Sequence, residues 1–199
     1  NHRGYEVTVF EKDEYVGGLL RFGIPNFKLQ KAVIDRRVRV MEAEGIEFRT
    51  GHAVALDALP EGYDAWCICT GTPDARNPDI PGRELRGIHF ALELLAQQNR
   101  VLAGQTFSEE QRVTAKGKRV LVIGGGDTGS DCIGTANRQG AVSVTQIEIM
   151  PKPPVGSNPA TPWPQWPQVF KTTSSHEEGC TRRWCLAANR FLGSPGGRV

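Results

Sequence analysis

A chain of 199 residues is long enough to bury a sizeable core, as one large domain or two small ones. Its 24 lysines and arginines nearly balance its 22 aspartates and glutamates, so the net charge of +2 argues against a nucleic acid or a membrane surface as partner. No apolar run approaches the roughly 18 residues that span a bilayer. Five cysteines, an odd number with no C-x-x-C pair, favour a reducing, cytoplasmic setting and no metal site.

The first 50 residues have the pattern of part of a dinucleotide-binding unit. A predicted strand at 6–11 ends in an acid, Glu11, and a loop at 16–25 with three glycines and a proline predicts irregular backbone. An amphipathic helix at 29–44 and a strand at 46–50 follow. Residues 7–11 also align with 144–148, where an acid again ends a strand. This parallel predicts that the glycine loop of the first unit precedes residue 1, and that the chain is a fragment.

The middle of the chain contains one further predicted strand and a connection. The apolar run at 63–72 predicts a strand that leads into a Thr-Gly turn, and its two cysteines, Cys67 and Cys69, would face the same side as packed thiols. Residues 73–82 are rich in proline, aspartate and asparagine and predict a connection between domains. A helix is expected at 88–98 and a polar loop at 104–118.

The segment 119–131 carries the most specific pattern. The short apolar run 120–123 predicts a buried parallel strand, and Gly124, Gly126 and Gly129 then give G-x-G-x-x-G. A helix at 128–139 and a strand at 142–149 follow, and Glu148 lies 148 − 126 = 22 residues after Gly126. A carboxylate at about this spacing binds a ribose in dinucleotide sites. A glycine turn in an ordinary α/β domain is the alternative, but the strand and helix on either side favour a dinucleotide.

The last 50 residues carry fewer signals. Proline and tryptophan crowd residues 151–168, which predicts a loop without regular structure that packs its tryptophans on the domain. His176, with Glu177 and Glu178, could lie near a bound nicotinamide, but a solvent-exposed first turn of a helix is the interpretation we favour.

Several blocks of the sequence together resemble the small (β) subunit of glutamate synthase. They comprise residues 9–12, 17–25, 27–29, 124–134, 137–140, 150–154, 163–167 and 174–179. The resemblance implies an α/β fold of the flavin disulfide reductase type, with Rossmann-like dinucleotide-binding domains and a parallel sheet covered by helices on both faces. Residues 1–80 would be a partial FAD-binding domain. Residues 81–199 would be an NAD(P)H-binding domain with its core at 118–150.

The family's activity implies the cofactors and partners that we expect. Its members take a hydride from NADPH, or NADH in some, onto FAD, and pass electrons through iron–sulfur clusters to the large (α) subunit, where glutamate forms. The 4Fe-4S clusters would lie in an N-terminal part outside this chain and in the partner. Another flavin electron-entry module, similar to dihydropyrimidine dehydrogenase, and a non-catalytic nucleotide-binding scaffold are the alternatives.

The resemblance also implies roles for individual residues. Glu11 would bind the FAD ribose beside Lys12, and Val54 would meet the adenine through its backbone. The other residues expected at FAD are Gly18, Leu19, Ile24, Pro25, Lys28, Thr70 and Gly71, with Cys69 standing where relatives have alanine. The residues expected at the phosphates of the nicotinamide cofactor are Gly125, Gly126, Asp127 and Thr128, within the motif from Gly124 to Gly129.

The choice between NADPH and NADH stays open on the residues alone. Glu148 favours a free ribose 2′-hydroxyl and therefore NADH. Arg138 and Lys152 are the residues that could supply positive charge to a 2′-phosphate. The block 137–140 favours NADPH, by resemblance only.

Overall fold

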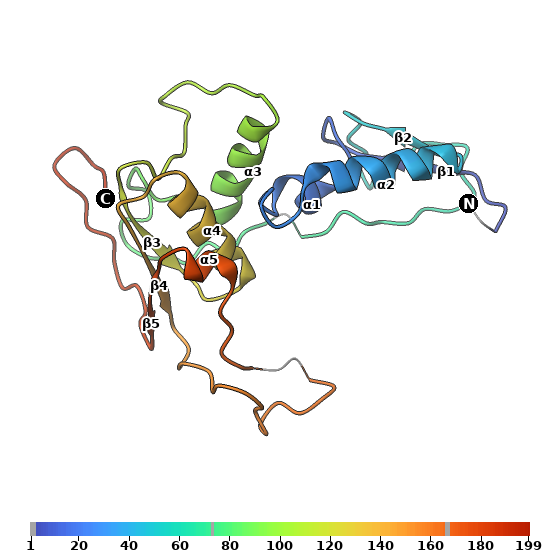
Figure 1. The fold of residues 1–199 in the computed structure, drawn as a ribbon. Coiled ribbons are helices and arrows are strands. Elements are labelled where there is room, and N and C mark those ends of the chain that lie inside the picture. The colour runs from blue at the N-terminus through green and yellow to red at the C-terminus, as the bar shows by residue number, and fades with distance from the viewer. Residues whose placement is uncertain (1–2, 73, 166–167) are drawn as a thin grey trace. The chain divides into compact units, whose positions relative to one another are not determined.

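The computed structural model describes residues 3–72, 74–165 and 168–199. The chain divides into two compact units, Asn1–Arg76 and Asn77–Val199, so the boundary falls four residues before the position expected from the sequence. Within the described residues the paired strands of both units are parallel, and a helix lies in each connection or packs on the sheet (Figure 1). None of the described helices is long and apolar enough to cross a membrane.

The first unit is built on a two-stranded parallel sheet. Strand β1 (Val7–Phe10) pairs with β2 (Ile46–Arg49), and the connection contains the short helix α1 (Gly18–Phe22) and the longer helix α2 (Lys31–Ala43). Helix α2 packs on β2 and buries Ile34, and Gly45, with φ of 90°, allows the chain to turn from the helix into β2. Strands β1 and β2 and helix α2 lie within two residues of the positions predicted from the sequence.

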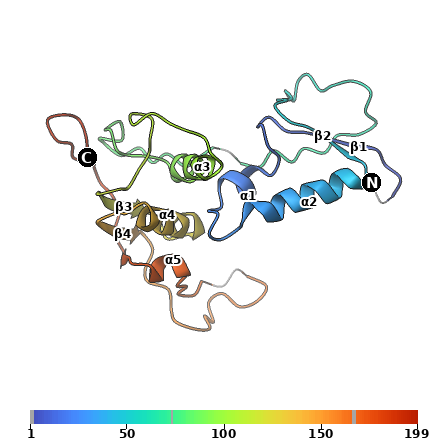
Figure 2. The ribbon, with the colours of Figure 1, turned by 45° about the horizontal axis from the view of Figure 1, so that its top comes forward.

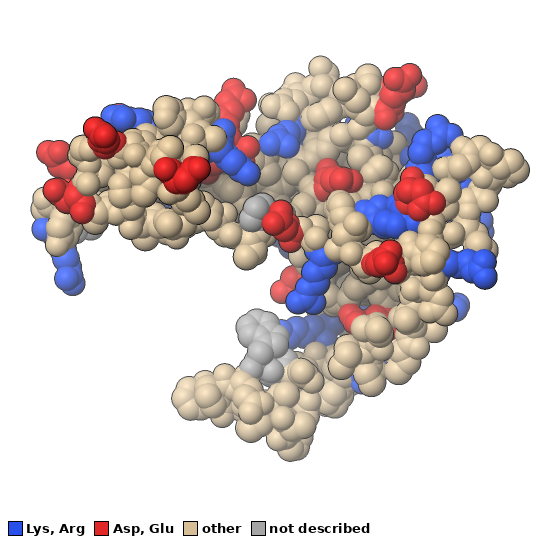
Figure 3. All heavy atoms as spheres, turned by 180° about the vertical axis from the view of Figure 1, so that it is seen from behind, with Lys and Arg blue, Asp and Glu red and all other residues tan. Residues whose placement is uncertain are grey.

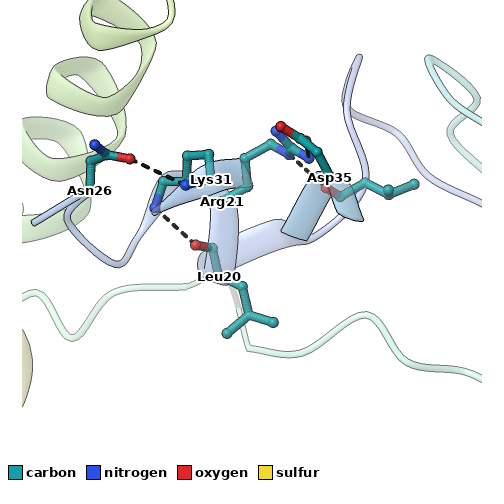
Figure 4. A network of polar contacts seen from close by, with 6 residues as sticks. Leu20, Arg21, Asn26, Lys31 and Asp35 are labelled. Carbon is teal, nitrogen blue, oxygen red and sulfur yellow. Dashed lines mark hydrogen bonds and ion pairs between the residues drawn. The ribbon is translucent and has the colours of Figure 1, made fainter. Parts of the chain in front are cut away.

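The glycine-rich loop at 16–25 contains helix α1, where the sequence predicts irregular backbone. Contacts with α2 hold this single turn in place (Figure 4). The Lys31 ammonium donates to the carbonyls of Leu20 and Ile24 at 3.1 and 2.5 Å, and Arg21 pairs with Asp35. The Lys31 side chain thus ties α1 and the residues just after it to the start of α2. Burial, together with the nearby charge of Arg21, lowers the pKa of Lys31.

Residues 63–72 do not form the predicted strand. Tyr63 and Trp66 instead pack on Phe10 of β1, each with ring centroids 5.8 Å from the Phe10 ring, and the described backbone beyond them joins no ladder. Cys67 and Cys69 do lie on one side, with their sulfurs 3.5 Å apart, but both are exposed rather than packed. Apolar alternation predicts a strand only where the backbone finds a hydrogen-bonding partner, and the sequence does not show whether one exists.

The second unit is built on a three-stranded parallel sheet. Strand β4 (Ser143–Glu148) lies between β3 (Arg119–Ile123) and β5 (Thr181–Trp184). Helix α4 (Asp127–Arg138) connects β3 to β4 and packs on both. Helices α3 (Ala91–Leu102) and α5 (Ser174–Glu177) in turn pack on α4, as Figure 2 also shows. Helix α3 begins three residues later than predicted, where the Glu93 carboxylate accepts the backbone N–H of Phe90.

The core of the second unit lies between α3, α4 and one face of the sheet. Its fully or nearly fully buried members are Leu95, Ala115, Val122, Cys132, Ile133, Ala136 and Val144. On the opposite face Leu121 and Ile123 are about half exposed, and no described helix packs there. The predicted α/β fold is therefore observed, although only one of the two sheet faces expected to carry helices does so within the described residues.

Residues 151–165 form irregular structure, as predicted, but Trp163 is 92 % exposed and does not pack on the domain. The other tryptophan of the predicted loop, Trp166, lies outside the described residues. Lysine, arginine and carboxylate side chains are intermixed over the face seen in Figure 3, in keeping with the nearly balanced charge.

Candidate nucleotide-binding site

The glycine motif lies at the carboxyl end of β3 and leads directly into α4. Gly124 has φ of 118°, a conformation that favours glycine, and its N–H donates to the carbonyl of Ile147 at 2.9 Å. Helix α4 begins at Asp127, and its N-cap, Gly126, provides no side-chain hydrogen bond. The first N–H groups of the helix therefore lack a side-chain cap, which is the arrangement that binds phosphate.

A side chain would meet different surroundings at Gly125, Gly126 and Gly129. A Cβ on Gly129 would lie 2.6 Å from the carbonyl oxygen of Gly124, so this glycine allows α4 to pack against the turn. A Cβ on Gly125 would collide with the carboxylate of Glu148. A Cβ on Gly126 would meet nothing within 4 Å. Open space above an uncapped helix start fits the pyrophosphate of a dinucleotide.

A cleft of about 520 Å³ opens beside this motif, within the size range of ligand pockets. It lies at the carboxyl ends of the parallel strands, where nucleotides bind in open α/β sheets. The predicted residues that line it are Gly125, Gly126, Asp127, Glu148 and Lys152. Residues 151–154 and 168–171 form one wall, which is fixed by a hydrogen bond of 2.8 Å from the Phe170 N–H to the Pro154 carbonyl.

Four side chains that line the cleft form a cluster, and Lys152 is the one among them that was predicted from the sequence. Phe170 and Trp184 lie edge to face with centroids 5.8 Å apart, and the cationic groups of Lys152 and Arg182 lie 4.7 to 5.3 Å from the two rings. We call Lys152, Phe170, Arg182 and Trp184 the aromatic–cation wall. A flat apolar surface flanked by two positive charges suits a nucleoside that carries a phosphate.

Glu148 lies where a ribose-binding carboxylate is expected. It ends β4, its side chain reaches Gly125, and one carboxylate oxygen accepts the Met150 N–H at 3.2 Å. Because β3 and β4 are adjacent and parallel, a carboxylate at the end of β4 lies beside the glycine turn that follows β3. This pairing accounts for the spacing between Gly126 and Glu148 in the sequence.

His176 is buried, which corrects the prediction of a solvent-exposed helical turn. It is 9 % exposed, and its Nε2 lies 3.2 Å from Oε1 of Gln146, a residue of β4 that is itself buried. Its Nδ1 accepts the backbone N–H of Thr173 at 3.1 Å. Glu177 and Glu178 are exposed, so the three residues do not act as one cluster.

Arg138 does not line the cleft. It lies at the far end of α4 from the glycine turn, and its guanidinium forms two hydrogen bonds with Glu178, at 2.8 and 3.1 Å. A helix of this length separates its two ends by about 16 Å. Thr128 is exposed on the first turn of α4, Gly124 and Gly129 are half-buried, and none of the three lines the cleft.

The residues expected at FAD lie in the first unit in two groups. Glu11 follows β1, and its carbonyl accepts the N–H of His52, so the end of β1 is tied to the segment that contains Val54. The second group comprises Gly18 and Leu19 in α1 and Ile24, Pro25 and Lys28 after it; Pro25 is buried and Leu19 is 56 % exposed.

The remaining residues expected at FAD are exposed. They are Lys12, Thr70 and Gly71. Gly71 has φ of 67°, which supports the predicted turn at this point although the strand before it is absent.

Comparisons with known proteins agree with this architecture. The family model described as pyridine nucleotide-disulphide oxidoreductase matches residues 3–160. A solved structure of a variant of FprA from Mycobacterium tuberculosis superposes with a TM-score of 0.56 at 20 % identity, over 72 % of this chain and 36 % of that one. A 2-naphthoyl-CoA reductase complex gives 0.58 at 17 % identity, over 99 % and 28 %. At these identities the two structures establish the fold alone.

Curated relatives are more similar in sequence. The glutamate synthase [NADPH] small chain of Mycobacterium tuberculosis is 46 % identical over 97 % of this chain, and that of Bacillus subtilis is 42 % identical over 89 %. The glutamate synthase [NADH] of Saccharomyces cerevisiae is 40 % identical over the whole chain. The chain spans 41 %, 37 % and 10 % of these relatives, respectively. These relatives confirm the resemblance seen in the sequence, and the family match shows that the chain belongs to the pyridine nucleotide-disulphide oxidoreductases.

Proposed function

We propose that this chain is part of the small subunit of an NADPH-dependent glutamate synthase and that residues 77–199 bind NADPH. The observation that carries the proposal is the glycine turn, which opens onto the cleft at the start of α4, where a Cβ on Gly126 would meet nothing within 4 Å. Relatives named as glutamate synthase small chains support the assignment to this enzyme rather than to another flavin reductase.

In the proposed complex the backbone N–H groups of Gly125 and Gly126 bind the pyrophosphate, and Glu148 accepts a hydrogen bond from the adenosine ribose. The aromatic–cation wall packs on the adenosine part, and its two cations bind the 2′-phosphate. Four cations (Lys152, Lys171, Arg182 and Arg183) and two carboxylates (Asp127 and Glu148) line the cleft. This excess of positive charge supports NADPH over NADH, because it offsets the repulsion between Glu148 and a 2′-phosphate.

Bound NADPH would supply a hydride and bound FAD would accept it, and the residues of the chain would bind and orient the two cofactors. In this proposal the first unit contributes to the FAD site the ribose contact of Glu11 and the expected residues in α1 and in the segment after it. The expected iron–sulfur clusters, the large subunit that receives the electrons and a cytoplasmic location belong to the same proposal. They rest on the resemblance to glutamate synthase.

Nucleotide titration of a Lys152→Ala variant tests the proposal. Losing a charge-assisted contact to the 2′-phosphate should weaken NADPH about tenfold and leave NADH within about twofold. Lys116→Ala is the matched control, because Lys116 is exposed and lies outside the cleft. An equal loss for both cofactors would refute the 2′-phosphate role. Following the flavin absorbance of the chain with FAD and NADPH under anaerobic conditions then tests hydride transfer.

A further inference from the structure

Gln146 is a polar residue in the middle of a buried strand, where an apolar side chain is expected. It is 2 % exposed and lies between Val144 and the end of β4, on the face that α4 covers. Burying a primary amide is costly unless both its ends are hydrogen-bonded. Both ends are: Nε2 donates to the carbonyl of Gly124 at 2.9 Å, and Oε1 lies 3.2 Å from Nε2 of His176.

The chemistry of the partners fixes the orientation of this amide. The Gly124 carbonyl only accepts, so the amide must present its NH₂ group there and its oxygen to His176. His176 must then carry its proton on Nε2 and leave Nδ1 as an acceptor. Nδ1 does accept, from the Thr173 N–H at 3.1 Å, so both sides of the imidazole require the same neutral tautomer.

The hydrogen bond to the Gly124 carbonyl also fixes the next amide. In a trans peptide the C=O and the following N–H point in opposite directions. With the Gly124 carbonyl turned inward to Gln146, the N–H of Gly125 faces away from the interior, and Gly125 lines the cleft. Two consecutive glycines could otherwise rotate this peptide at little cost, because glycine populates both signs of φ.

We propose that Gln146, held in orientation by His176, is a positioning residue that aims the Gly125 amide at the pyrophosphate of the dinucleotide. The proposal rests on NADPH binding by this cleft and adds how the glycine turn is organised for it. Both residues line the cleft but are only 2 % and 9 % exposed, so the role proposed for them acts through the turn. Their effect is preorganisation: the turn is held in its binding geometry before the ligand arrives, so that less ordering entropy is lost on binding.

Three substitutions separate the two hydrogen bonds. Gln146→Glu keeps the size of the side chain and an acceptor for His176 but removes the donor to Gly124. His176→Asn keeps an acceptor for the Thr173 N–H but removes the donor to Gln146. His176→Gln is the matched control, because its amide keeps a donor near the position of Nε2.

NADPH affinity by calorimetry is compared with the affinity for adenosine 2′-phosphate by NMR titration, since the smaller ligand lacks the pyrophosphate. We expect Gln146→Glu and His176→Asn to weaken NADPH about tenfold, the loss of roughly one hydrogen bond to a charged group. Adenosine 2′-phosphate should stay within about twofold. His176→Gln should retain NADPH binding within about threefold.

Two outcomes would overturn the inference: unchanged NADPH affinity in Gln146→Glu, or an equal loss for both ligands, which would indicate only a damaged fold. Failure of the wild-type chain to bind NADPH would refute the proposed function and this inference with it. Wild-type binding with insensitive variants would refute the inference alone.

Discussion

Gly126 and Gly129 both belong to the glycine motif, yet the structure predicts that alanine at the two positions has opposite consequences. A methyl group on Gly129 would lie 2.6 Å from the Gly124 carbonyl oxygen and 3.2 Å from Nε2 of Gln146. A methyl group on Gly126 would meet nothing within 4 Å, and its backbone angles, φ −78° and ψ −178°, are allowed for alanine. Gly129→Ala should therefore lose stability, and Gly126→Ala should lose nucleotide binding.

The magnitudes follow from the contacts. Overpacking costs about 1–3 kcal/mol, and the upper end applies at Gly129 because the obstacle is a backbone carbonyl held by Gln146. Replacing a helical glycine by alanine returns about 1 kcal/mol, so Gly129→Ala should destabilise the unit by about 2 kcal/mol, or about 6–10 °C in Tm. At Gly126 the poorer N-cap and the stiffer unfolded chain nearly cancel, so stability should change by less than about 0.5 kcal/mol.

The assay measures thermal unfolding and NADPH affinity on the same two variants. Gly126→Ala should bind NADPH at least about tenfold more weakly, since the methyl group occupies the space in front of the helix start, while its Tm stays near that of the wild type. The reasoning is refuted if Gly129→Ala unfolds at the wild-type temperature. It is also refuted if Gly126→Ala binds NADPH as tightly as the wild type.

Two further predictions concern the core of the second unit. Leu95→Ala should lower the free energy of unfolding by about 2–5 kcal/mol in urea titrations, because Leu95 is 2 % exposed. Leu102→Ala on the same helix is the control: Leu102 is 61 % exposed, so the free energy of unfolding should change by less than about 0.5 kcal/mol. Similar losses in the two variants would contradict the assigned core. Burial, with the nearby charge of Asp131, raises the pKa of Cys132 to about 12, so the folded chain keeps this thiol neutral. The contribution of the neutral, buried thiol to folding stability is therefore fully present below about pH 9 and is lost as the pH rises towards 12. In native alkylation at pH 8 followed by mass spectrometry, the exposed Cys185 should react and Cys132 should not; comparable labelling of both would contradict the buried placement.

The segment from β3 to β4 could be predicted from the sequence to within one residue at each end. The predicted ranges 120–123, 128–139 and 142–149 compare with Arg119–Ile123, Asp127–Arg138 and Ser143–Glu148 in the structure. This accuracy has a local cause: a β-branched run, a glycine turn and a helix ended by a glycine each specify their own backbone. The position of Glu148 beside the turn then follows from the pairing of adjacent parallel strands.

Other features depend on partners that the local sequence does not identify. Strand β5 was missed because Arg182 and Arg183 interrupt its apolar pattern. Arg182 is nonetheless half-buried, with its guanidinium 5.3 Å from the Trp184 ring, while Arg183 is exposed. Residues 63–72 have a strand-like composition but no ladder, and α1 forms where glycine and proline predict a loop because Lys31 and Arg21 fix it to its surroundings.

The sequence by itself thus determined the fold class, the glycine motif and the carboxylate at the end of β4, because each is a short-range pattern with its own backbone geometry. Only the tertiary structure decided which distant residues complete the cleft. It brings together the four residues of the aromatic–cation wall, which lie between 152 and 184 in the sequence. It places Arg138 beside Glu178, outside the cleft, and buries His176 against Gln146. The physical reason is that side chains far apart in the chain meet only when strands pair and helices pack. Whether Arg138 or Lys152 lines the cleft therefore depends on that packing and not on how near each residue is to the glycine motif in the sequence.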